Sequence, residues 1–531
     1  MKIQLSQMKG MIPVLDDNLL PEGFASRTLN CRPEGDGVVP FKLPVEAGFS
    51  IAAGVKSWSL YHYDKTETLS RTDNADFLRG PIANDAYNRM YAAGDSEKPQ
   101  VYYSVGGSSP LFADLAIKVP NTPSVSSSWN NADPGDPSIP VYNSVYYVTG
   151  VTILGEESAP SDVTQVIQRW DTALVPVSLG SNNDSRVVKR RLYRSDAGGD
   201  FQLVLEAVAG INTINDGKDT AQLGYVCESE NFNAPPDNLE GLVNAGNGYM
   251  ASWFENTVCF CEPYYPHAWP IDYQYSIPAT VKGMAATQGA LIVTTDSQPY
   301  VFQGTHPGGI SILKLDLRAP NLSRRGIVDM GETAFYPSTE GLVAIGAGGA
   351  NVITREIFSK EQWLALDPAS FVAFRYRSFY LCFASTGAFA FDPAKGYWPL
   401  EITGVDGDQV LDGHYDDETD TLYLLVKSGD DSLTVFEFDS GSNMQMLWES
   451  REHVRPGRAV ISSGRLDSEA EAALTLVGSH RGSEVYSSSH TTSTDEGFRF
   501  SPGFYSRFKV RLESEDRINS AAIASTKAEL L

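Results

Sequence analysis

Short runs of β-forming residues separated by turn residues recur along this chain, and they constrain its fold more than any other feature. The densest series lies between residues 246 and 448, with strands predicted at residues 290–295, 298–303, 378–383 and 388–391. Gly, Pro, Ser or Asp bounds each run, which is typical of antiparallel hairpins. The units repeat about every forty to fifty residues, the spacing of four-stranded propeller blades. We predict an all-β fold built on a β-propeller. A sandwich or an open meander would give similar local patterns, and the blade number, five or six, stays open.

The pattern changes between residues 138 and 232. Turn signals there recur about every ten residues, which suits a small β-sandwich. Proline-rich segments flank this region at residues 133–140 and 233–237, and β signals lie on both sides of it. We therefore predict an inserted β-sandwich inside the propeller sequence. The predicted domains are 1–137 (amino-terminal segment and first blades), 138–232 (insert), 233–456 (remaining blades) and 457–531 (carboxy-terminal β-rich, sandwich-like region).

Helical signals are few in this sequence. Ser359 and Gln362 have the spacing of a capping box that opens one short helix. Beyond residue 457 the chain is richer in serine, and strands are predicted at residues 472–477, 504–512 and 518–525.

Charge excludes several classes of function. The chain has 41 Lys and Arg against 66 Asp and Glu, a net charge of −25. A protein this acidic repels nucleic acids and anionic membranes, so a conventional nucleic-acid binder is disfavoured. The charge can serve solubility alone. In a protein that forms a channel, it can also let a polyanion slide past without sticking.

Neither a secretory signal nor a membrane span is predicted. The amino terminus has no uninterrupted apolar stretch, and no window approaches eighteen uncharged apolar residues. The cysteines are odd in number and show no paired CxxC spacing, so we expect reduced core residues made in a reducing cytosol. They are Cys31, Cys227, Cys259, Cys261 and Cys382.

Searches of the sequence for catalytic chemistry give no site. The histidines show no metal-binding spacing, and no GxSxG, GxxxxGK[ST] or GxGxxG motif is present in a suitable context. These histidines are His62, His267, His306, His414, His453, His480 and His490. The acidic residues Asp406, Asp408, Asp412 and the group at 416–420 could hold Ca²⁺, but solvated hairpin turns explain them better. We predict no catalytic, cofactor-binding or metal-binding residues, and no enzyme.

A sugar-cleaving site is the enzymatic alternative that we considered. It would need two carboxylates across a cleft, which distant blades can supply. Tyr264, Tyr265, Trp269 and Tyr273 could stack on sugars, although packing between blades is the commoner use of such rings.

Several segments resemble a family of phage and prophage virion proteins. The opening segment resembles the proline-rich start of that family, and residues 79–91 resemble the segment that follows it. The residues of the opening are Met11, Pro13, Leu19, Pro21, Ala25, Asn30, Gly35, Gly37, Pro40 and Pro44. Residues 263–270 and 291–304 are similar to the family's central blades, and residues 449–456 and 521–531 to its end. The insert resembles a fibronectin type III domain at residues 146–149, 155–161 and 191–199.

The resemblance implies a tail nozzle, also called tail tubular protein B, of a short-tailed phage. Such a protein is expected to form a hexameric ring below a tail adaptor, with tail fibres or spikes alongside. Double-stranded DNA and ejection proteins would pass through its channel without specific binding. It would be a structural virion protein, assembled in the host cytoplasm, without membrane insertion of its own. The alternative is a receptor-binding or glycan-degrading virion tail protein.

Overall fold

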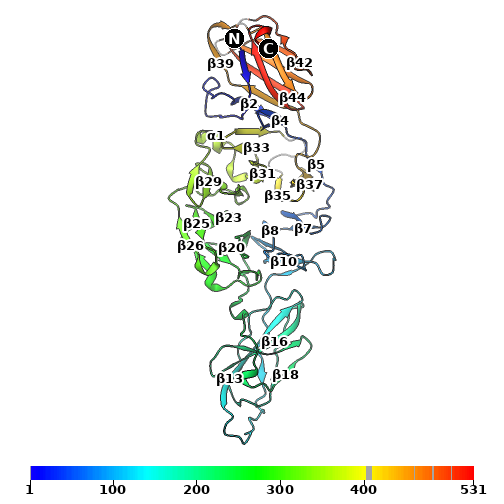
Figure 1. Cartoon of the computed structure of the whole chain (residues 1–531), viewed down its shortest axis with the longest axis vertical. Coiled ribbons are helices and arrows are strands. Elements are labelled where there is room, and N and C mark those ends of the chain that lie inside the picture. Colours follow the sequence, from blue (N-terminus) through cyan, green and yellow to red (C-terminus); the bar gives the residue numbers. More distant parts are fainter. Residues whose placement is uncertain are drawn as a thin grey trace.

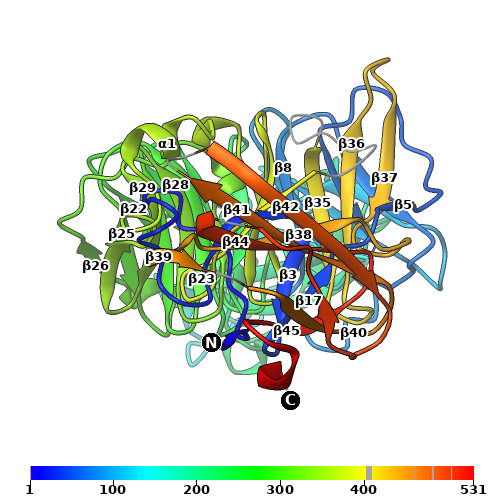
Figure 2. The same cartoon turned by 90° about the horizontal axis from the view of Figure 1, so that it is seen from above.

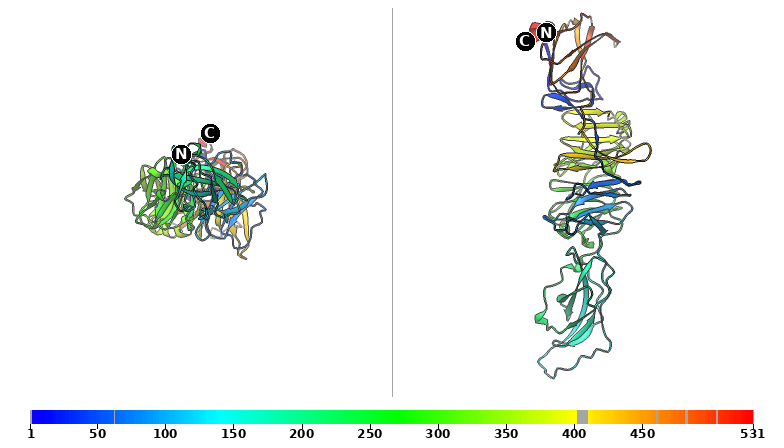
Figure 3. Two further views of the ribbon diagram at one scale, coloured as in Figure 1. Left: turned by 90° about the horizontal axis from the view of Figure 1, so that it is seen from below. Right: turned by 90° about the vertical axis from the view of Figure 1, so that its right-hand side faces the viewer.

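The structure is a computed structural model that describes residues 2–61, 63–401, 410–459, 461–480, 483–503 and 505–530. The chain is elongated and has three parts along its long axis (Figure 1). A sandwich that contains both termini lies at one end, a ring of small sheets lies in the middle, and a second sandwich lies at the other end (Figure 3).

The ring consists of small antiparallel sheets, which we call blades 1 to 7 in chain order. Blade 1 has β6 (Ser57–Leu60) and β7 (Thr68–Arg71), and blade 2 has β8 (Ala75–Arg79), β9 (Met90–Gly94), β10 (Gln100–Tyr103) and β11 (Leu111–Asp114). Blade 3 has β19 (Glu240–Asn244), β20 (Met250–Phe254), β21 (Thr257–Phe260) and β22 (Gln274–Ser276). Blade 4 has β23 (Val281–Thr287), β24 (Ala290–Thr295), β25 (Tyr300–Gln303) and β26 (Ser311–Lys314).

The remaining blades follow without interruption. Blade 5 has β27 (Val328–Asp329), β28 (Ala334–Ser338), β29 (Gly341–Gly346) and β30 (Gly349–Val352). Blade 6 has β31 (Val372–Tyr376), β32 (Phe379–Ala384), β33 (Gly387–Asp392) and β34 (Gly396–Leu400). Blade 7 has β35 (Val410–Asp416), β36 (Thr421–Lys427), β37 (Leu433–Glu437) and, from far upstream, β5 (Val45–Glu46).

The first strands of the blades close a circle. In the described part of the chain, β6, β8, β19, β23, β27, β31 and β35 each contact the next, and β35 contacts β6 again. The all-β propeller that the sequence predicts is therefore confirmed. Its ring holds seven sheets among the described residues, more than the five or six that the sequence indicates, because blade 1 has only two described strands and gives little repeat signal.

Packing between blades explains the sequence of the middle strands. All six side chains of β24 and of β32 are buried, because each sheet is covered on both faces by neighbouring blades. A strand covered on both faces is a continuous apolar run instead of an alternating one. The outermost strand β26 is exposed at every position, as expected at the rim of the ring.

An early strand completes the last blade. Glu46 and Val45 of β5 pair with Phe436 and Glu437 of β37, so a segment that precedes blade 1 in sequence supplies the outer strand of blade 7. This pairing ties the beginning of the ring to its end. Figure 2 shows β5 beside β37 and β36 at the edge of the molecule.

The insert is a sandwich of a three-stranded and a four-stranded sheet. The strands are β12 (Ser124–Val125), β15 (Val175–Ser178) and β18 (Thr213–Asp216) in one sheet, and β14 (Ile167–Trp170), β13 (Val141–Thr152), β16 (Val187–Asp196) and β17 (Gln202–Val208) in the other. Buried side chains of both sheets, including Tyr146, Val177 and Leu192, form its core. Because β12 pairs with β15, the proline-rich segment 133–140 is a loop inside the sandwich and not a linker before it. The fibronectin type III likeness stays a prediction.

Strands from both ends of the chain build the terminal sandwich. One sheet has β1 (Lys2–Leu5), β3 (Cys31–Glu34), β4 (Gly37–Pro40), β45 (Ile518–Ala524), β40 (Ser463–Ser468) and β43 (Phe498–Arg499). The other has β2 (Ala25–Leu29), β38 (Met446–Ser450), β39 (His453–Ala459), β44 (Tyr505–Ser514), β41 (Ala472–His480) and β42 (Ser483–Thr492). The carboxy-terminal sandwich thus includes the first forty residues, which the sequence patterns assigned to a separate segment.

Helices are short. The α-helix α1 (Lys360–Leu364) begins at the predicted capping box: the hydroxyl of Ser359 accepts from the amide of Gln362, whose side chain accepts from the amide of Ser359. Within the described ranges, no helix has the length and apolar character needed to span a bilayer.

Candidate functional site

Two arginines occupy the centre of the ring. Arg324 and Arg325 lie on the 3₁₀-helix η5 (Arg324–Gly326), between blades 4 and 5, and they reach across to blades 1, 2 and 7. The Arg324 guanidinium donates to Asp76 over 3.0 Å, and that of Arg325 lies 3.2 Å from Asp76 and 3.1 Å from Asp412. Arg325 also donates to the carbonyl of Ala75 over 2.7 Å. We call Asp76, Arg324, Arg325 and Asp412 the axial cluster.

Burial and charge pairing act in opposite directions on the pKa values of the two carboxyls in the axial cluster. Burial would raise the pKa of Asp76, but Arg324 and Arg325 outweigh this effect and hold it below its ordinary value. Burial raises the pKa of Asp412, and Arg325 offsets only part of that increase. The space left around the cluster is about 200 Å³ and is lined also by Trp253 and Met284. The axis of this propeller is therefore filled by its own side chains, so it offers no passage for a macromolecule.

Blade 7 concentrates the negative charge. Residues 410–440 contain nine Asp and Glu and one Lys. Asp417, Glu418 and Asp420 lie in the β35–β36 turn, Asp430 and Asp431 lie in the β36–β37 turn, and all five are exposed. In Figure 2 the β36–β37 hairpin extends beyond the other blades. An acidic, protruding edge of this kind repels polyanions over about a Debye length of 8–10 Å.

A buried ionic cluster joins the insert to the ring. Arg89 of blade 2 donates to Asp85 and to Glu156 of the insert, each over 2.8 Å. His267 of blade 3 donates through Nε2 to the carbonyl of Glu157 over 3.0 Å, and its Nδ1 lies 3.9 Å from the carboxylate of Glu156. The side chains of Arg89, Glu156 and His267 are all less than one tenth exposed. The contacts fix how the insert is attached.

We expect acidification to weaken this junction. Burial lowers the pKa of His267, and the guanidinium groups of Arg89 and Arg186 lower it further. The Glu156 carboxylate and the hydrogen bond from His267 to the carbonyl of Glu157 raise this pKa, but by less. At neutral pH this lowered pKa has no effect on the free energy of unfolding, because the histidine is neutral in both the folded and the unfolded chain. It destabilises the folded state as pH falls below about 6.5, where the unfolded chain gains the proton. Between pH 7.5 and 5.0 the melting temperature of the wild type should fall further than that of His267→Gln, whose side-chain amide can still donate to the carbonyl of Glu157. The control is His306→Gln at an exposed site; parallel pH profiles for wild type and His267→Gln would contradict the prediction.

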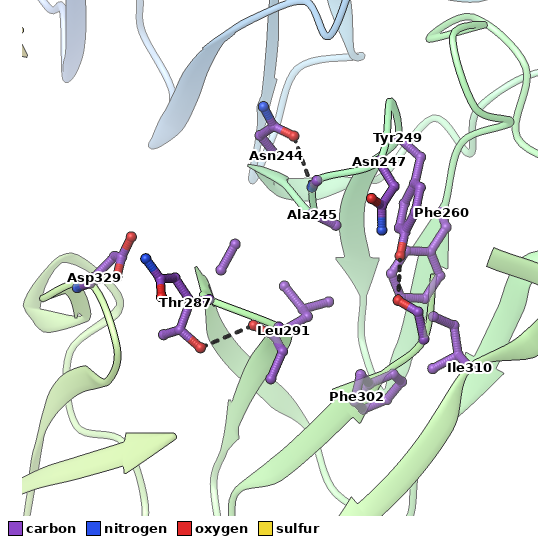
Figure 4. A pocket seen from close by; sticks show the side chains of 17 residues that line it. Asn244, Ala245, Asn247, Tyr249, Phe260, Thr287, Leu291, Phe302, Ile310 and Asp329 are labelled. Atoms are coloured by element: carbon purple, nitrogen blue, oxygen red, sulfur yellow. Dashed lines mark hydrogen bonds between the residues drawn. The ribbon is translucent and has the colours of Figure 1, made fainter. Parts of the chain in front are cut away.

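A cleft of about 600 Å³ opens between blades 3 and 4 (Figure 4). The β19–β20 turn with Asn244 and Asn247 forms one wall, and the β23–β24 turn with Thr287 and Gln288 forms another. Asp329 at the start of blade 5 lies at the rim. The floor is apolar and consists of Tyr249, Phe260, Leu291, Phe302 and Ile310.

The aromatic residues that were considered for sugar stacking divide into two groups. Trp269 is 1% exposed, and its indole donates to the carbonyl of Pro266, so it packs between strands and is not available to a ligand. Tyr264 and Tyr265 are exposed, and Tyr273 lies edge-on to His306. None of the four lines the cleft.

The other candidate groups serve the fold. All five cysteines are buried and free, and burial raises the pKa of Cys259 and of Cys261 to about 12. Asp412 pairs with Arg325 and Asp416 with Lys65, while His62, Asp406 and Asp408 lie outside the described residues. Among the described residues, no group of three or more His, Cys, Asp or Glu side chains is arranged to hold a metal ion. The sequence patterns missed the axial cluster, whose only local signal is the adjacent pair Arg324-Arg325.

Comparison with known proteins gives no family. No protein-family model and no curated protein matches the sequence. Solved structures with some similarity include BBS1N in complex with ARL6DN (11% identity, 75% of this chain, 97% of that chain, TM-score 0.31) and the Neurospora crassa Pan2 WD40 domain (6%, 73%, 96%, 0.30). A third is the extracellular domain of the putative hybrid two component system BT4673 from B. thetaiotaomicron (8% identity, 84% of this chain, 47% of that chain, TM-score 0.32). Similarity at this level carries no information on function.

Proposed function

We propose that this chain is a structural subunit of a short-tailed phage tail, of the nozzle type, and that copies of it form a ring around a conduit. The observation that carries the proposal is the placement of charge. The axial cluster fills the centre of the propeller, so a conduit would have to lie between copies of the chain. Blade 7 offers a protruding acidic edge suited to the wall of such a conduit, because DNA would pass it without adhering.

The elongated shape supports the same proposal. The insert and the terminal sandwich lie at opposite ends of the ring of blades (Figure 1). In a closed ring of parallel subunits, one of these ends can contact the part of the tail above and the other the part below. The resemblance in sequence suggests six copies, a tail adaptor as the partner above and tail fibres or spikes alongside.

The experiment is native mass spectrometry of the recombinant chain, followed by electron microscopy of purified virions. We expect a closed ring of identical subunits, about six, with blade 7 facing the lumen. Lysine substitutions at Asp417, Glu418 and Asp430 should slow DNA release from assembled virions, since a basic wall binds phosphate. The matched control places lysine at the exposed Asp133, Asp200 and Asp237. A chain that is strictly monomeric and absent from virions would refute the proposal, and so would a ring whose lumen is basic.

A receptor-binding role is the second candidate, and the cleft between blades 3 and 4 is the observation that favours it. Cleavage of a glycan is less well supported, since Asp329 is the one carboxylate among the described residues that line the cleft, and hydrolysis uses two.

A further inference from the structure

The cleft between blades 3 and 4 has the size and form of a small-ligand site. Its volume of about 600 Å³ falls in the range that ligand pockets occupy. Gly246 and Gly289 at its rim have positive φ angles of 82° and 81°, and a Cβ atom at either position would meet no atom within 4 Å. The two turns that form the walls therefore leave the rim uncovered at these two positions.

The floor of the cleft is apolar and rigid. Phe260 lies edge-on to Tyr249, with ring centroids 5.8 Å apart, and Phe302 packs beside Phe260 at 6.4 Å. The Tyr249 hydroxyl donates to the carbonyl of Gly304, which holds that ring in place. Leu291 and Ile310 complete the surface. The C–H face of a sugar ring fits an apolar floor of this kind.

The rim supplies neutral hydrogen-bonding groups. Asn244, Asn247 and Gln288 each carry an amide that can both donate and accept, which suits hydroxyl groups. The side-chain oxygen of Asn244 already accepts from the backbone amide of Gly246, so its NH₂ group is the part of this amide that can still donate to a ligand. Asn247 has a φ of 50°, a left-handed conformation that asparagine tolerates well.

Charge in the cleft excludes anionic ligands. No Lys or Arg is among the described residues that line it, and Asp329 is the one charged side chain there. Burial raises the pKa of Asp329, and Arg375 and the amide of Gly331 offset only part of that increase. A phosphate or a uronate would meet the carboxylate of Asp329, and the described lining residues offer it no Lys or Arg as a direct partner.

We propose that the cleft between blades 3 and 4 binds a neutral hexopyranoside, with one face of the ring on Ala286, Leu291 and Ile310 and its hydroxyls on Asn244, Asn247 and Gln288. Neither the proposal nor its test depends on the tail function.

The test is saturation-transfer NMR on the full-length protein with methyl glucoside, methyl galactoside, methyl mannoside and their common disaccharides. We expect at least one to bind with a Kd of roughly 1–10 mM, as is usual for a ligand held by few contacts. The strongest saturation should fall on the ring protons of one face. The methyl glycoside of glucuronic acid serves as the charged probe and should bind at least tenfold more weakly.

Three variants make the test specific. Asn247→Gly keeps the left-handed backbone and removes the amide, and together with Gln288→Ala it should weaken binding at least fivefold. The matched control is Asn84→Gly, at an exposed asparagine with a φ of 52° far from the cleft, which should bind as the wild type does. Asp329→Asn should keep neutral-sugar binding within twofold and bring the glucuronide to a similar affinity.

Three results would overturn the proposal. One is the absence of saturation transfer from every pyranoside. Another is binding that Asn247→Gly with Gln288→Ala leaves unchanged. The third is a preference of the wild-type protein for the glucuronide.

Discussion

Asp76→Ala should destabilise the ring by about 3 kcal/mol, because it leaves Arg324 and Arg325 without their shared carboxylate. These residues hold together blades that lie on opposite sides of the ring, so the loss should appear as local opening at its centre. Hydrogen exchange of the peptides around residues 74–79 and 322–328 should become faster by a factor on the order of 100.

Two controls separate this effect from ordinary surface changes. Asp237→Ala removes an exposed partner of Lys98 and should alter stability by less than about 0.5 kcal/mol. Asp76→Ala combined with Arg324→Met removes charge from both sides, leaves Arg325 paired with Asp412, and should recover part of the loss. If the amide hydrogens of these peptides exchange in Asp76→Ala at the wild-type rate, the axial cluster does not hold the ring together.

Asp216→Ala should unfold the insert while the ring stays folded. The carboxylate of Asp216 accepts from Arg194 over 2.6 Å and from the Tyr146 hydroxyl over 2.8 Å, and it lies 3.5 Å from the Arg169 guanidinium. The side chains of Asp216, Arg169 and Arg194 are fully buried. Removing Asp216 leaves Arg194 with Asp196 as its remaining ion-pair partner and leaves the buried Arg169 guanidinium with backbone carbonyl acceptors, which costs about 4 kcal/mol. A small sandwich has little more stability than that.

Calorimetry and limited proteolysis measure this outcome. The insert has its own core, so its melting transition should move to lower temperature or disappear, and proteases should cleave between residues 120 and 232. Tyr146→Phe deletes one hydrogen bond to the same carboxylate and should cost about 1 kcal/mol. The control Asp200→Ala lies in an exposed turn and should have no effect. Unchanged protease resistance in Asp216→Ala would contradict the prediction.

Local features of this fold could be predicted from the sequence. The strand at residues 290–295 and the capping box at Ser359 and Gln362 depend on neighbours a few residues away, and both are confirmed. The all-β propeller follows from the repetition of such hairpins. Turn chemistry and apolar runs are local properties, and for that reason they are visible in a single sequence.

Contacts between distant segments could not be predicted in the same way. Arg325 and Asp76 are 249 residues apart, and β5 pairs with a strand about 390 residues later. A two-residue strand such as β5 carries no periodic signal, and a charged residue in a predicted loop does not indicate its partner. Trp269 is of a residue type that often stacks on sugars, and only its burial in the structure shows that it serves packing.

The late pairing of the amino-terminal strands has a consequence for synthesis in the cell. At about 5–20 residues per second, the ribosome needs roughly 20–80 s after making β5 before its partner β37 exists. Strands β1, β2 and β4 wait longer still, for partners in the last hundred residues. Prematurely terminated chains therefore keep unpaired edges that a cell's quality-control machinery can recognise, and only finished chains acquire the complete surface.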